Sequence, residues 1–215
     1  MGRKKKEKFA ENLTFKSLIQ YDYTNAKNLI DDYIGGESIT LELGCGKGEY
    51  TLALAKKYPN RKFLGVDIQG ERLWKGAKEV DEQSIQNAKF FRVNIEKITQ
   101  YIPKESVEEI WLTFPDPFPK NRNAKKRLVS ENFLPKYIAI GKSNLRIHLK
   151  TDSELLYNYT LEILQRKKIT PELLSNNVHE DEKLVDSDVV DIKTYFEGKH
   201  LLAGRKIHYI RFILK

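Results

Sequence analysis

Three glycines at alternate positions, Gly44, Gly46 and Gly48, are the first residues whose spacing could support chemistry. They follow the apolar segment 38–43 and precede a segment typical of a helix. Glycine permits a tight turn and lets a ligand approach bare backbone. The third glycine comes too early for a dinucleotide-binding loop, and no Gly-Lys-Ser or Gly-Lys-Thr follows as in a phosphate-binding loop. The loop therefore predicts a ligand site without a phosphate anchor.

Acidic residues flank this loop in sequence. Asp67 ends the next apolar segment, 23 residues after Gly44, and a carboxylate at that place accepts the two hydroxyls of a ribose. A ligand with ribose and adenine but no phosphate fits best, which favours S-adenosyl-L-methionine. Glu42 is then expected to attract the cationic end of the ligand, directly or through water. A helix cap is the alternative for Asp67, and Cys45 lacks an identifiable partner for a nucleophilic role.

The segment 114–120, Phe-Pro-Asp-Pro-Phe-Pro-Lys, is the most distinctive in the chain. Its three prolines fix φ and bias the preceding residues toward extended backbone. A stiff loop that presents Asp116 beside aromatic rings suits the binding of a nucleobase. It is similar to the Asp/Asn-Pro-Pro-aromatic loop of methyltransferases that act on nitrogens in flat rings. The alternative is a proline-stiffened turn without function.

A basic run follows directly, with five positive residues and no acid in 120–127. Residues 1–8 carry a charge of +4 and residues 120–127 carry +5, so the remaining 199 residues of this +8 chain sum to −1. The protein is therefore a near-neutral domain with two basic segments. The second predicts a place for phosphates beside the ligand site, and a merely solvated face is the alternative.

The elements that must position these residues alternate along the chain. Apolar segments predict strands, and amphipathic segments predict helices between them. The expected strands are 38–43, 62–66, 89–93, 109–114, 145–149 and 207–214, and the expected helices are 49–57, 70–80, one capped by Ser130, and one that opens at 151–153 with Leu155, Leu156, Tyr159 and Ile163 inward. The alternation predicts an α/β fold with a doubly wound, mostly parallel sheet, whose ligands bind at the carboxyl ends of the strands.

The domain organisation follows from composition. Residues 1–36 are expected to form a basic tail, mobile over 1–8, and an N-terminal extension, and residues 37–215 a single domain. Residues 180–191 are acidic and predict a loop. One cysteine excludes an intramolecular disulfide or zinc finger, and the four histidines show no ligand spacing, so no metal is expected. No apolar run approaches a membrane span, which favours a cytoplasmic protein without membrane contact.

The sequence resembles the bacterial tRNA (guanine-N7-)-methyltransferases from about residue 8 to the C-terminus. The resemblance rests on five motifs: LELGCGKGEY (41–50), GVDI (65–68), IWLTFPDPFPKNRNAKKRL (110–128), HLKTD (148–152) and KTYFEGKHLLAG (193–204). It implies the class I methyltransferase (Rossmann-like) fold with a seven-stranded sheet. It also implies methyl transfer from S-adenosyl-L-methionine to guanine N7 in the tRNA variable loop, position 46, with S-adenosyl-L-homocysteine as product.

The resemblance also implies roles for individual residues. The methyl donor would contact Glu42, Gly44, Gly46, Gly48, Asp67, Asn94 and Asp116, the last also as the catalytic residue. Substrate would contact Lys120, Asp152, Thr194, Tyr195, Phe196 and Glu197, and RNA would lie against Arg122, Asn123, Ala124, Lys125, Lys126 and Arg127. Asn94 stands where many members have Asp, and Phe118 where Trp is common. The expected partner is tRNA, with no obligatory protein subunit, for a monomer or homodimer.

Two other functions remain as alternatives at this point. One is an enzyme with another methyl acceptor, such as an adenine amino group or a small molecule, against which the basic run argues. The other is an RNA-binding protein with a degenerate cofactor pocket, against which the intact glycine loop and Asp67 argue. A titration with the methyl donor separates the second alternative from both enzymes.

Overall fold

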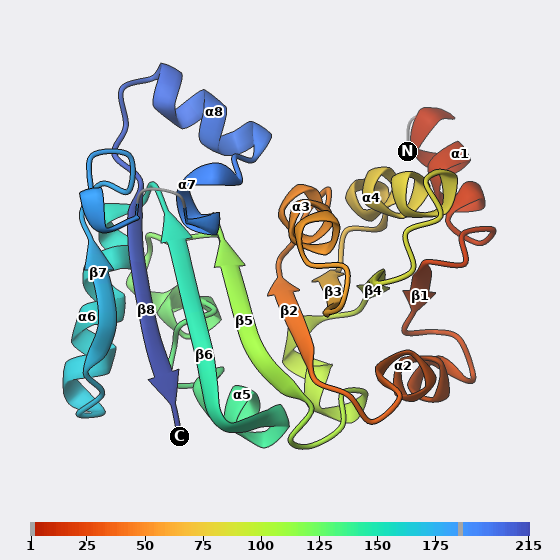
Figure 1. The fold of residues 1–215 in the computed structure, drawn as a ribbon, viewed down its shortest axis with the longest axis horizontal. Coiled ribbons are helices and arrows are strands. Elements are labelled where there is room, and N and C mark those ends of the chain that lie inside the picture. Colours follow the sequence, from red (N-terminus) through yellow and green to blue (C-terminus); the bar gives the residue numbers. More distant parts are fainter. Residues whose placement is uncertain (1–2, 185–186) are drawn as a thin grey trace.

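The computed structural model describes residues 3–184 and 187–215, which are arranged around one open sheet (Figure 1). The strands of this part of the chain are β1 (Leu18–Gln20), β2 (Ile39–Leu43), β3 (Lys62–Asp67), β4 (Ala88–Arg92), β5 (Val107–Thr113), β6 (Gly141–Thr151), β7 (Pro171–Ser175) and β8 (His208–Leu214). They lie in the order β1-β4-β3-β2-β5-β6-β8-β7. Pairs from β1 to β6 are parallel, and β8 is antiparallel to both its neighbours.

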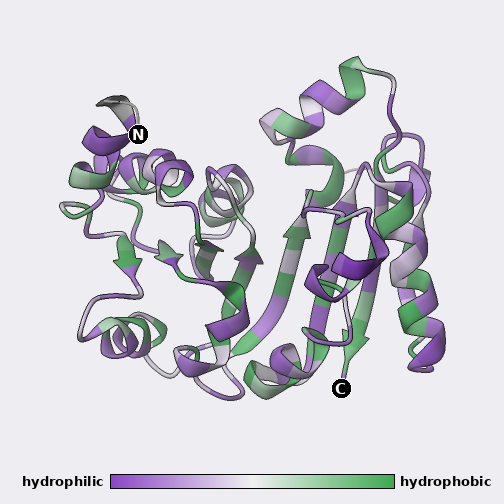
Figure 2. Ribbon diagram, turned by 180° about the vertical axis from the view of Figure 1, so that it is seen from behind, coloured by the Kyte–Doolittle hydropathy of each residue, from purple (hydrophilic) through white to green (hydrophobic). Residues whose placement is uncertain are grey.

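Helices cover both faces of the sheet. They are α1 (Arg3–Glu11), α2 (Ala26–Ile34), α3 (Glu49–Lys57), α4 (Gly70–Glu82), α5 (Leu134–Ile140), α6 (Glu154–Arg166), α7 (Asp188–Asp191) and α8 (Tyr195–Leu202), with 3-10 helices η1 (Ile95–Gln100), η2 (Asn121–Lys126) and η3 (Glu182–Leu184). Figure 2 shows hydrophilic and hydrophobic residues interspersed along these helices, as expected for elements with one buried side.

The alternation of side chains along the strands divides the core into two clusters. Phe91 and Ile110 belong to one cluster, with residues of α2, η1, α5 and α6. Their chain neighbours Phe90 and Trp111 belong to the other, with residues of α3, α4 and α7. Successive strand residues point to opposite faces, so each cluster fills one side of the sheet. This arrangement confirms the predicted doubly wound, mostly parallel α/β fold.

The N-terminal segment differs from the expected mobile tail. Residues 3–8 belong to α1, which packs on α4, while residues 1–2 lie outside the described part of the chain. Lys5 forms an ion pair with Glu71 at 2.9 Å, and the indole Nε1 of Trp74 donates a hydrogen bond to Glu11. These are tertiary contacts, which a local composition bias toward lysine does not reveal.

The sheet of the described residues contains eight strands, whereas the sequence patterns predict six and the resemblance implies seven. The patterns miss β7, which pairs only with β8, and β1. Strand β1 pairs in parallel with β4, Leu18 opposite Phe90, at the edge formed by the N-terminal extension. It is three residues long and fully buried, so it has no alternating pattern from which a strand could be predicted. The extension is thereby part of the same sheet as residues 37–215.

Three local predictions also need correction. Ser130 does not cap a helix: its hydroxyl donates to the carbonyl oxygen of Lys125, and α5 begins four residues later, with Pro135 in its first turn. Leu155 is 41% exposed instead of inward, and Thr160 occupies a buried position of α6. The acidic segment 180–191 is more than a loop, because it contains η3 and α7.

Candidate active site

The carboxyl ends of the parallel strands bring most of the predicted donor-binding residues together. Two adjoining cavities lie there, of about 280 Å³ and about 70 Å³, and they share Gly44, Arg72 and Phe114. The larger cavity is also lined by Asp67, Ile68, Gln69, Asn94, Ile95, Glu96, Asp116, Phe118, Lys126, Leu128 and Phe133. The smaller cavity is also lined by Glu42, Cys45, Gly46, Lys47, Glu49, Tyr50, Thr113, Thr194, Tyr195 and Phe196.

The glycine loop joins β2 to α3 through three residues with positive φ. The φ values of Gly44, Gly46 and Gly48 are +77°, +57° and +74°, a region that side chains other than glycine adopt at a cost. A Cβ on Gly48 would lie 2.3 Å from the ring of Phe90, whereas a Cβ on Gly46 would meet no described atom within 4 Å. Gly48 is therefore required for packing, and Gly46 leaves open space at the smaller cavity.

Asp67 fixes the loop and keeps capacity for a ligand. One carboxylate oxygen accepts the backbone N–H of Gly46 at 2.9 Å, and the other accepts that of Gln69 at 2.8 Å. A carboxylate offers about four lone-pair sites, so both oxygens can accept a further bond. Because the side chain is only 7% exposed and lines the larger cavity, those sites suit paired hydroxyls.

Glu42 lies deeper, at the end of β2, where it is almost fully buried. Its Oε1 accepts the hydroxyl of Thr113, and its Oε2 accepts the backbone N–H and the hydroxyl of Thr51. Burial raises the pKa of Glu42 from 4.5 to about 7, although these hydrogen bonds act in the opposite direction. A positive charge in the smaller cavity would favour its ionised form.

Asn94 follows β4 and caps η1. Its side-chain oxygen accepts the backbone N–H of Glu96 at 3.0 Å. The amide group retains a nitrogen that can donate, and it lines the larger cavity. Asn94 thus combines a structural cap with a polar surface toward a ligand.

The proline-rich loop follows β5 and presents Asp116, which is exposed at the larger cavity. The flanking residues Phe114 and Phe118 have φ values of +49° and +43°, which is costly for aromatic residues. The guanidinium of Arg127 holds this conformation, because its Nε and Nη2 donate to the carbonyl oxygens of Pro117 and Phe118 at 2.9 and 3.0 Å. Strain held by surrounding contacts is typical of functional loops.

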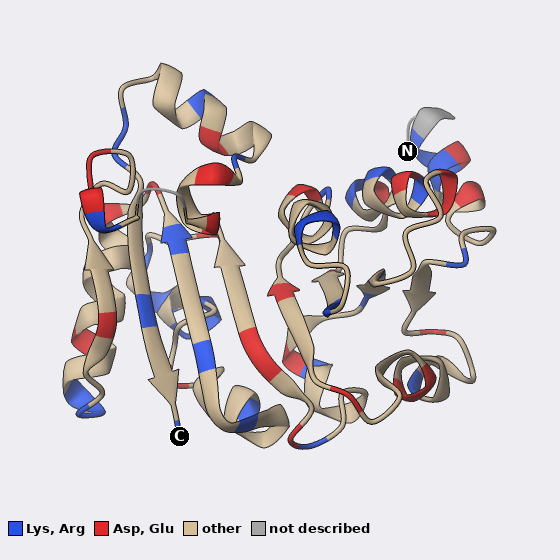
Figure 3. Cartoon of the chain, in the orientation of Figure 1, with Lys and Arg blue, Asp and Glu red and all other residues tan. Residues whose placement is uncertain are grey.

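Arg127 therefore differs from the RNA-facing residue that the sequence predicts. It is 4% exposed, and its guanidinium lies 4.3 Å from the ring centre of Tyr159. The other charged residues of the run, Lys120, Arg122, Lys125 and Lys126, are exposed, while Asn123 and Ala124 are half-buried. Figure 3 shows the cations of η2 grouped behind β6 and β8. The exposed basic surface is thus smaller than the run suggests.

The predicted substrate residues divide into two groups. Thr194 caps α8, and Tyr195 and Phe196 face the smaller cavity, with the backbone N–H of Tyr195 donating to Glu49 at 2.7 Å. Glu197, in contrast, is fully buried beside Lys150. A buried ion pair leaves no carboxylate for a substrate, so the structure does not place Glu197 as predicted.

Asp152 and Lys120 lie outside the lining of either cavity. Asp152 follows β6 and accepts a hydrogen bond from Arg205 at 2.8 Å, with His200 at 3.2 Å. Lys120 is exposed just before η2. Arg72 lines both cavities and Thr113 lines the smaller one, and neither residue was predicted from the sequence to belong to the site. Arg72 lies in the first turn of α4, five residues after Asp67, and this closeness to the end of β3 is the signal that could have indicated it.

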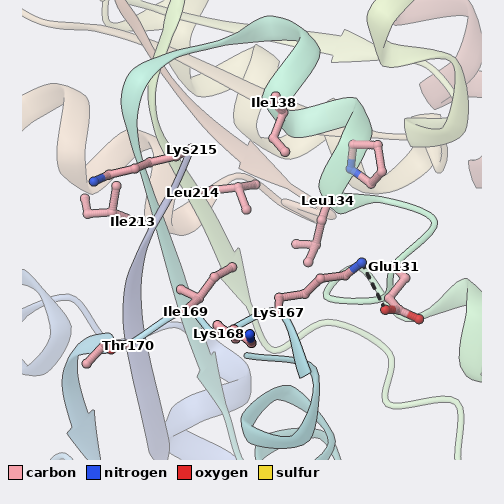
Figure 4. Close-up of a pocket in the computed structure, with 11 residues that line it drawn as sticks. Glu131, Leu134, Ile138, Lys167, Lys168, Ile169, Thr170, Ile213, Leu214 and Lys215 are labelled. Atoms are coloured by element: carbon pink, nitrogen blue, oxygen red, sulfur yellow. Dashed lines mark ion pairs between the residues drawn. The ribbon is translucent and has the colours of Figure 1, made fainter. Parts of the chain in front are cut away.

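A further cavity of about 580 Å³ lies at the opposite edge of the sheet (Figure 4). Leu134 and Ile138 of α5, the turn after α6 and the end of β8 line it, and Lys167 pairs there with Glu131 at 3.3 Å. Leu214 of β8 pairs with Leu145 near the start of β6, so this cavity lies far from the carboxyl ends of the parallel strands. It is separate from the candidate site.

The described residues form neither a metal site nor a membrane-spanning helix. Within residues 3–184 and 187–215, no group of three or more His, Cys, Asp or Glu is placed to hold a metal ion. Across the same ranges, no helix is both long and apolar enough to cross a membrane.

The fold and the strand-end site define a class I methyltransferase. Solved structures share the architecture at low sequence identity. The 16S rRNA methyltransferase KamB superposes with a TM-score of 0.66 at 12% identity, over 87% of this chain and 93% of that one. A geranyl diphosphate C-methyltransferase from Streptomyces coelicolor, solved with S-adenosyl-L-homocysteine, gives 0.55 at 11% identity over 91% and 82%. At such identities these similarities establish the fold alone.

Sequence comparison identifies the family. A family model described as "Putative methyltransferase" matches residues 36–210. A tRNA (guanine-N(7)-)-methyltransferase of Bacteroides fragilis is 39% identical over the whole chain and 87% of the relative, and one of Christiangramia forsetii is 38% identical over the whole of both. The chain belongs to the tRNA (guanine-N7-)-methyltransferases, a family of S-adenosylmethionine-dependent enzymes, which confirms the resemblance seen in its motifs.

Proposed function

We propose that this protein transfers the methyl group of S-adenosyl-L-methionine to N7 of a guanine in the tRNA variable loop, position 46. The products are 7-methylguanosine and S-adenosyl-L-homocysteine. The observation that carries the proposal is the juxtaposition of the glycine loop and Asp67 with the proline-rich loop at one cavity, with the exposed cations of η2 next to it. The relatives are named as tRNA (guanine-N(7)-)-methyltransferases, and the chain aligns with them over its full length.

The residues present fit the methyl donor. Asp67 has lone pairs for the ribose hydroxyls, the side-chain nitrogen of Asn94 can donate to a ring nitrogen of adenine, and Gly46 leaves room for close approach of the ligand. Glu42 provides negative charge beside the smaller cavity, where the cationic end would lie. When bound, the donor supplies an electrophilic methyl group on a sulfonium.

Catalysis would consist mostly of alignment. Guanine N7 has a lone pair and no proton, so no residue of the chain is needed to deprotonate the nucleophile. Good orientation of reacting groups supplies roughly 7–11 kcal/mol of a reaction barrier. The strained proline-rich loop holds Asp116 at the mouth of the larger cavity, where its carboxylate would orient the guanine and stabilise positive charge that develops in the purine.

The remaining predicted contacts have distinct roles in this proposal. Tyr195 and Phe196, half-exposed beside the smaller cavity, would contact the guanine ring. Lys120, Arg122, Lys125 and Lys126 would contact tRNA phosphates, because they are exposed and follow the loop of Asp116 directly. Extraction of the guanine from its stack costs a few kcal/mol, which these contacts would offset.

The direct test is transfer of a labelled methyl group from S-adenosyl-L-methionine to two tRNAs that differ only in the variable-loop guanosine. Label is expected only in the tRNA that has the guanosine, and chemical cleavage at 7-methylguanosine should cut the product at that position. Label in both tRNAs, or in adenosine, would instead assign a different acceptor. Donor binding without transfer to any tRNA would favour an enzyme with another methyl acceptor, and absence of donor binding would favour an RNA-binding protein with a degenerate pocket.

A further inference from the structure

Lys150 in β6 is fully buried, an unusual environment for a lysine. Its ammonium donates to Glu197 Oε2 at 2.7 Å, to the carbonyl oxygen of Ile192 at 3.1 Å, and to that of Val189. A lysine ammonium has three donors. All three are satisfied by one segment, which runs from α7 into the first turn of α8.

Glu197 completes this arrangement from the side of α8. Its carboxylate is also fully buried, and its second oxygen pairs with Nε2 of His179 at 2.9 Å. Its backbone N–H donates to the hydroxyl of Thr194, the cap of α8. We call Lys150, Glu197 and His179 the buried-lysine cluster. Both oxygens of Glu197 point to this cluster and away from the cavities.

The same turn of α8 presents its neighbours to the candidate active site. Tyr195 and Phe196 are 53% and 49% exposed and line the smaller cavity. The Tyr195 ring centre lies 4.9 Å from the ammonium of Lys47, in the glycine loop. Successive residues of a helix project about 100° apart, so an inward Glu197 sets the directions of Tyr195 and Phe196.

We propose that Lys150 and Glu197 are positioning residues, which hold residues 194–196 over the methyl-donor cavity through their buried ion pair. Glu197 therefore acts through Lys150 and does not contact the guanine. This role rests on the proposed function, because kcat for tRNA methylation is one of the quantities that test it. The contacts of the cluster themselves are independent of which substrate is methylated.

A double-mutant cycle distinguishes this role from direct contact with the substrate. Removing one partner of a buried pair leaves the other charge uncompensated, whereas removing both does not. Lys150→Met and Glu197→Gln are each expected to lower kcat for tRNA methylation at least tenfold. The double variant is expected to be no slower than the slower single variant.

Each variant is also titrated with S-adenosyl-L-homocysteine and with tRNA. Both affinities are expected to stay within threefold of wild type, because Asp67 and Asn94 follow β3 and β4, which are separated from β6 by β2 and β5, and because the exposed cations of η2 make no contact with Lys150, Glu197 or His179 among the hydrogen bonds and ion pairs of the cluster. Glu180→Gln is the matched control, since Glu180 is an exposed carboxylate next to His179, and its kcat should equal that of wild type. Multiplicative losses in the double variant would overturn the proposal and assign Glu197 an independent contact.

Amide hydrogen exchange provides a readout that does not depend on activity. In Glu197→Gln, and in the milder His179→Gln, amides of residues 195–202 should exchange at least tenfold faster, while those of β2 and β5 remain protected. Unchanged protection of 195–202 would overturn the proposal. A wild-type protein that forms no 7-methylguanosine would refute the proposed function, and the exchange measurement would still decide the role of the cluster.

Discussion

At the scale of the residue, the same type of side chain has opposite roles in this protein according to its burial. Arg127 and Glu197 lie in motifs that suggest contact with RNA and substrate, yet both are buried and hold other residues in place. Asp116 and Lys126 lie in the same motif as Arg127 and are exposed at the cavity. Substitutions of Arg127 and Glu197 should therefore disturb the positions of other residues, whereas substitutions of Asp116 and Lys126 should remove contacts with a ligand.

Asp116→Ala is expected to lose most turnover while tRNA binding stays nearly intact. The loss should be about 100-fold, the usual effect of removing one group that stabilises charge in a transition state. This loss is expected because Asp116 lies at the larger cavity, between the glycine loop and the cations of η2. Single-turnover methylation and filter binding of tRNA measure the two quantities. Near-normal turnover would exclude the role, and Asp116→Asn separates the effect of charge from that of orientation.

The raised pKa of Glu42 makes the stability of the protein depend on pH. In the folded state Glu42 binds its proton up to about pH 7, whereas in the unfolded state it releases it near pH 4.5. Its contribution to stability is therefore fully present below pH 4.5 and is lost as pH rises through 7. Over that window the loss amounts to roughly 3 kcal/mol at most.

Glu42→Gln removes this titration. The free energy of unfolding of wild type, relative to that of the variant, should fall between pH 5 and pH 8. The buried His148 has a lowered pKa and acts in the opposite direction, so the difference between the two proteins is the quantity to compare. Urea denaturation at each pH measures it. A difference that is constant with pH would show that Glu42 titrates in its ordinary range.

At the scale of the element, the strand–loop–helix unit of β2, the glycine loop and α3 determines the donor site. The loop has three residues with positive φ, and Asp67 of the neighbouring strand fixes its middle. Packing against Phe90 fixes its end. Substitutions within this one unit can therefore separate ligand binding from stability.

Gly46→Ala and Gly48→Ala make this separation. Both substitutions place a side chain at positive φ, which costs about 1–2 kcal/mol. Gly48→Ala adds a clash with Phe90, so its total loss of unfolding free energy should reach about 3 kcal/mol. Gly46→Ala should remain folded but bind S-adenosyl-L-homocysteine at least tenfold more weakly, because its methyl group would enter the open space of the cavity. Equal effects of the two variants on stability and binding would contradict this assignment.

At the scale of the whole molecule, charge is distributed unevenly around the sheet. The exposed cations of η2 adjoin the larger cavity. Other exposed lysines lie at the opposite ends of the parallel strands: Lys104 precedes β5, Lys142 is the second residue of β6, and Lys168 precedes β7. If tRNA binds at η2, replacing the cations of η2 should weaken tRNA binding more than replacing the same number of lysines at the opposite ends of the strands.

Replacing Arg122, Lys125 and Lys126 together with Ala should weaken tRNA binding and reduce its dependence on salt. Each lost phosphate contact lowers the slope of log K against log salt by roughly 0.7–0.9, so the combined change should be about 2. The matched control replaces Lys104, Lys142 and Lys168 and has the same net charge. Binding measured between low and moderate salt reports both slopes. Identical slopes in the two triple variants would make η2 a solvated face.

Local patterns of residue type were enough to predict the succession of elements and most residues of the donor site. β2, α3, β3 and α4 lie within about two residues of their predicted bounds, because their apolar periodicity is a local property of the chain. Gly44, Asp67, Asn94 and Asp116 meet at one cavity for a related reason. They end parallel strands or follow them, and parallel strands end at one edge of the sheet.

Which of the charged motif residues face a ligand depends, in contrast, on contacts between segments far apart in the chain. Arg127 and Glu197 differ from their neighbours in no way that spacing reveals, and their roles depend on Pro117, Phe118 and Lys150. The position of α1 against α4 and the addition of β1 to the sheet were likewise decided by contacts between distant segments. Burial and hydrogen-bond partners arise from the packing of the whole chain, and local patterns of residue type do not encode them.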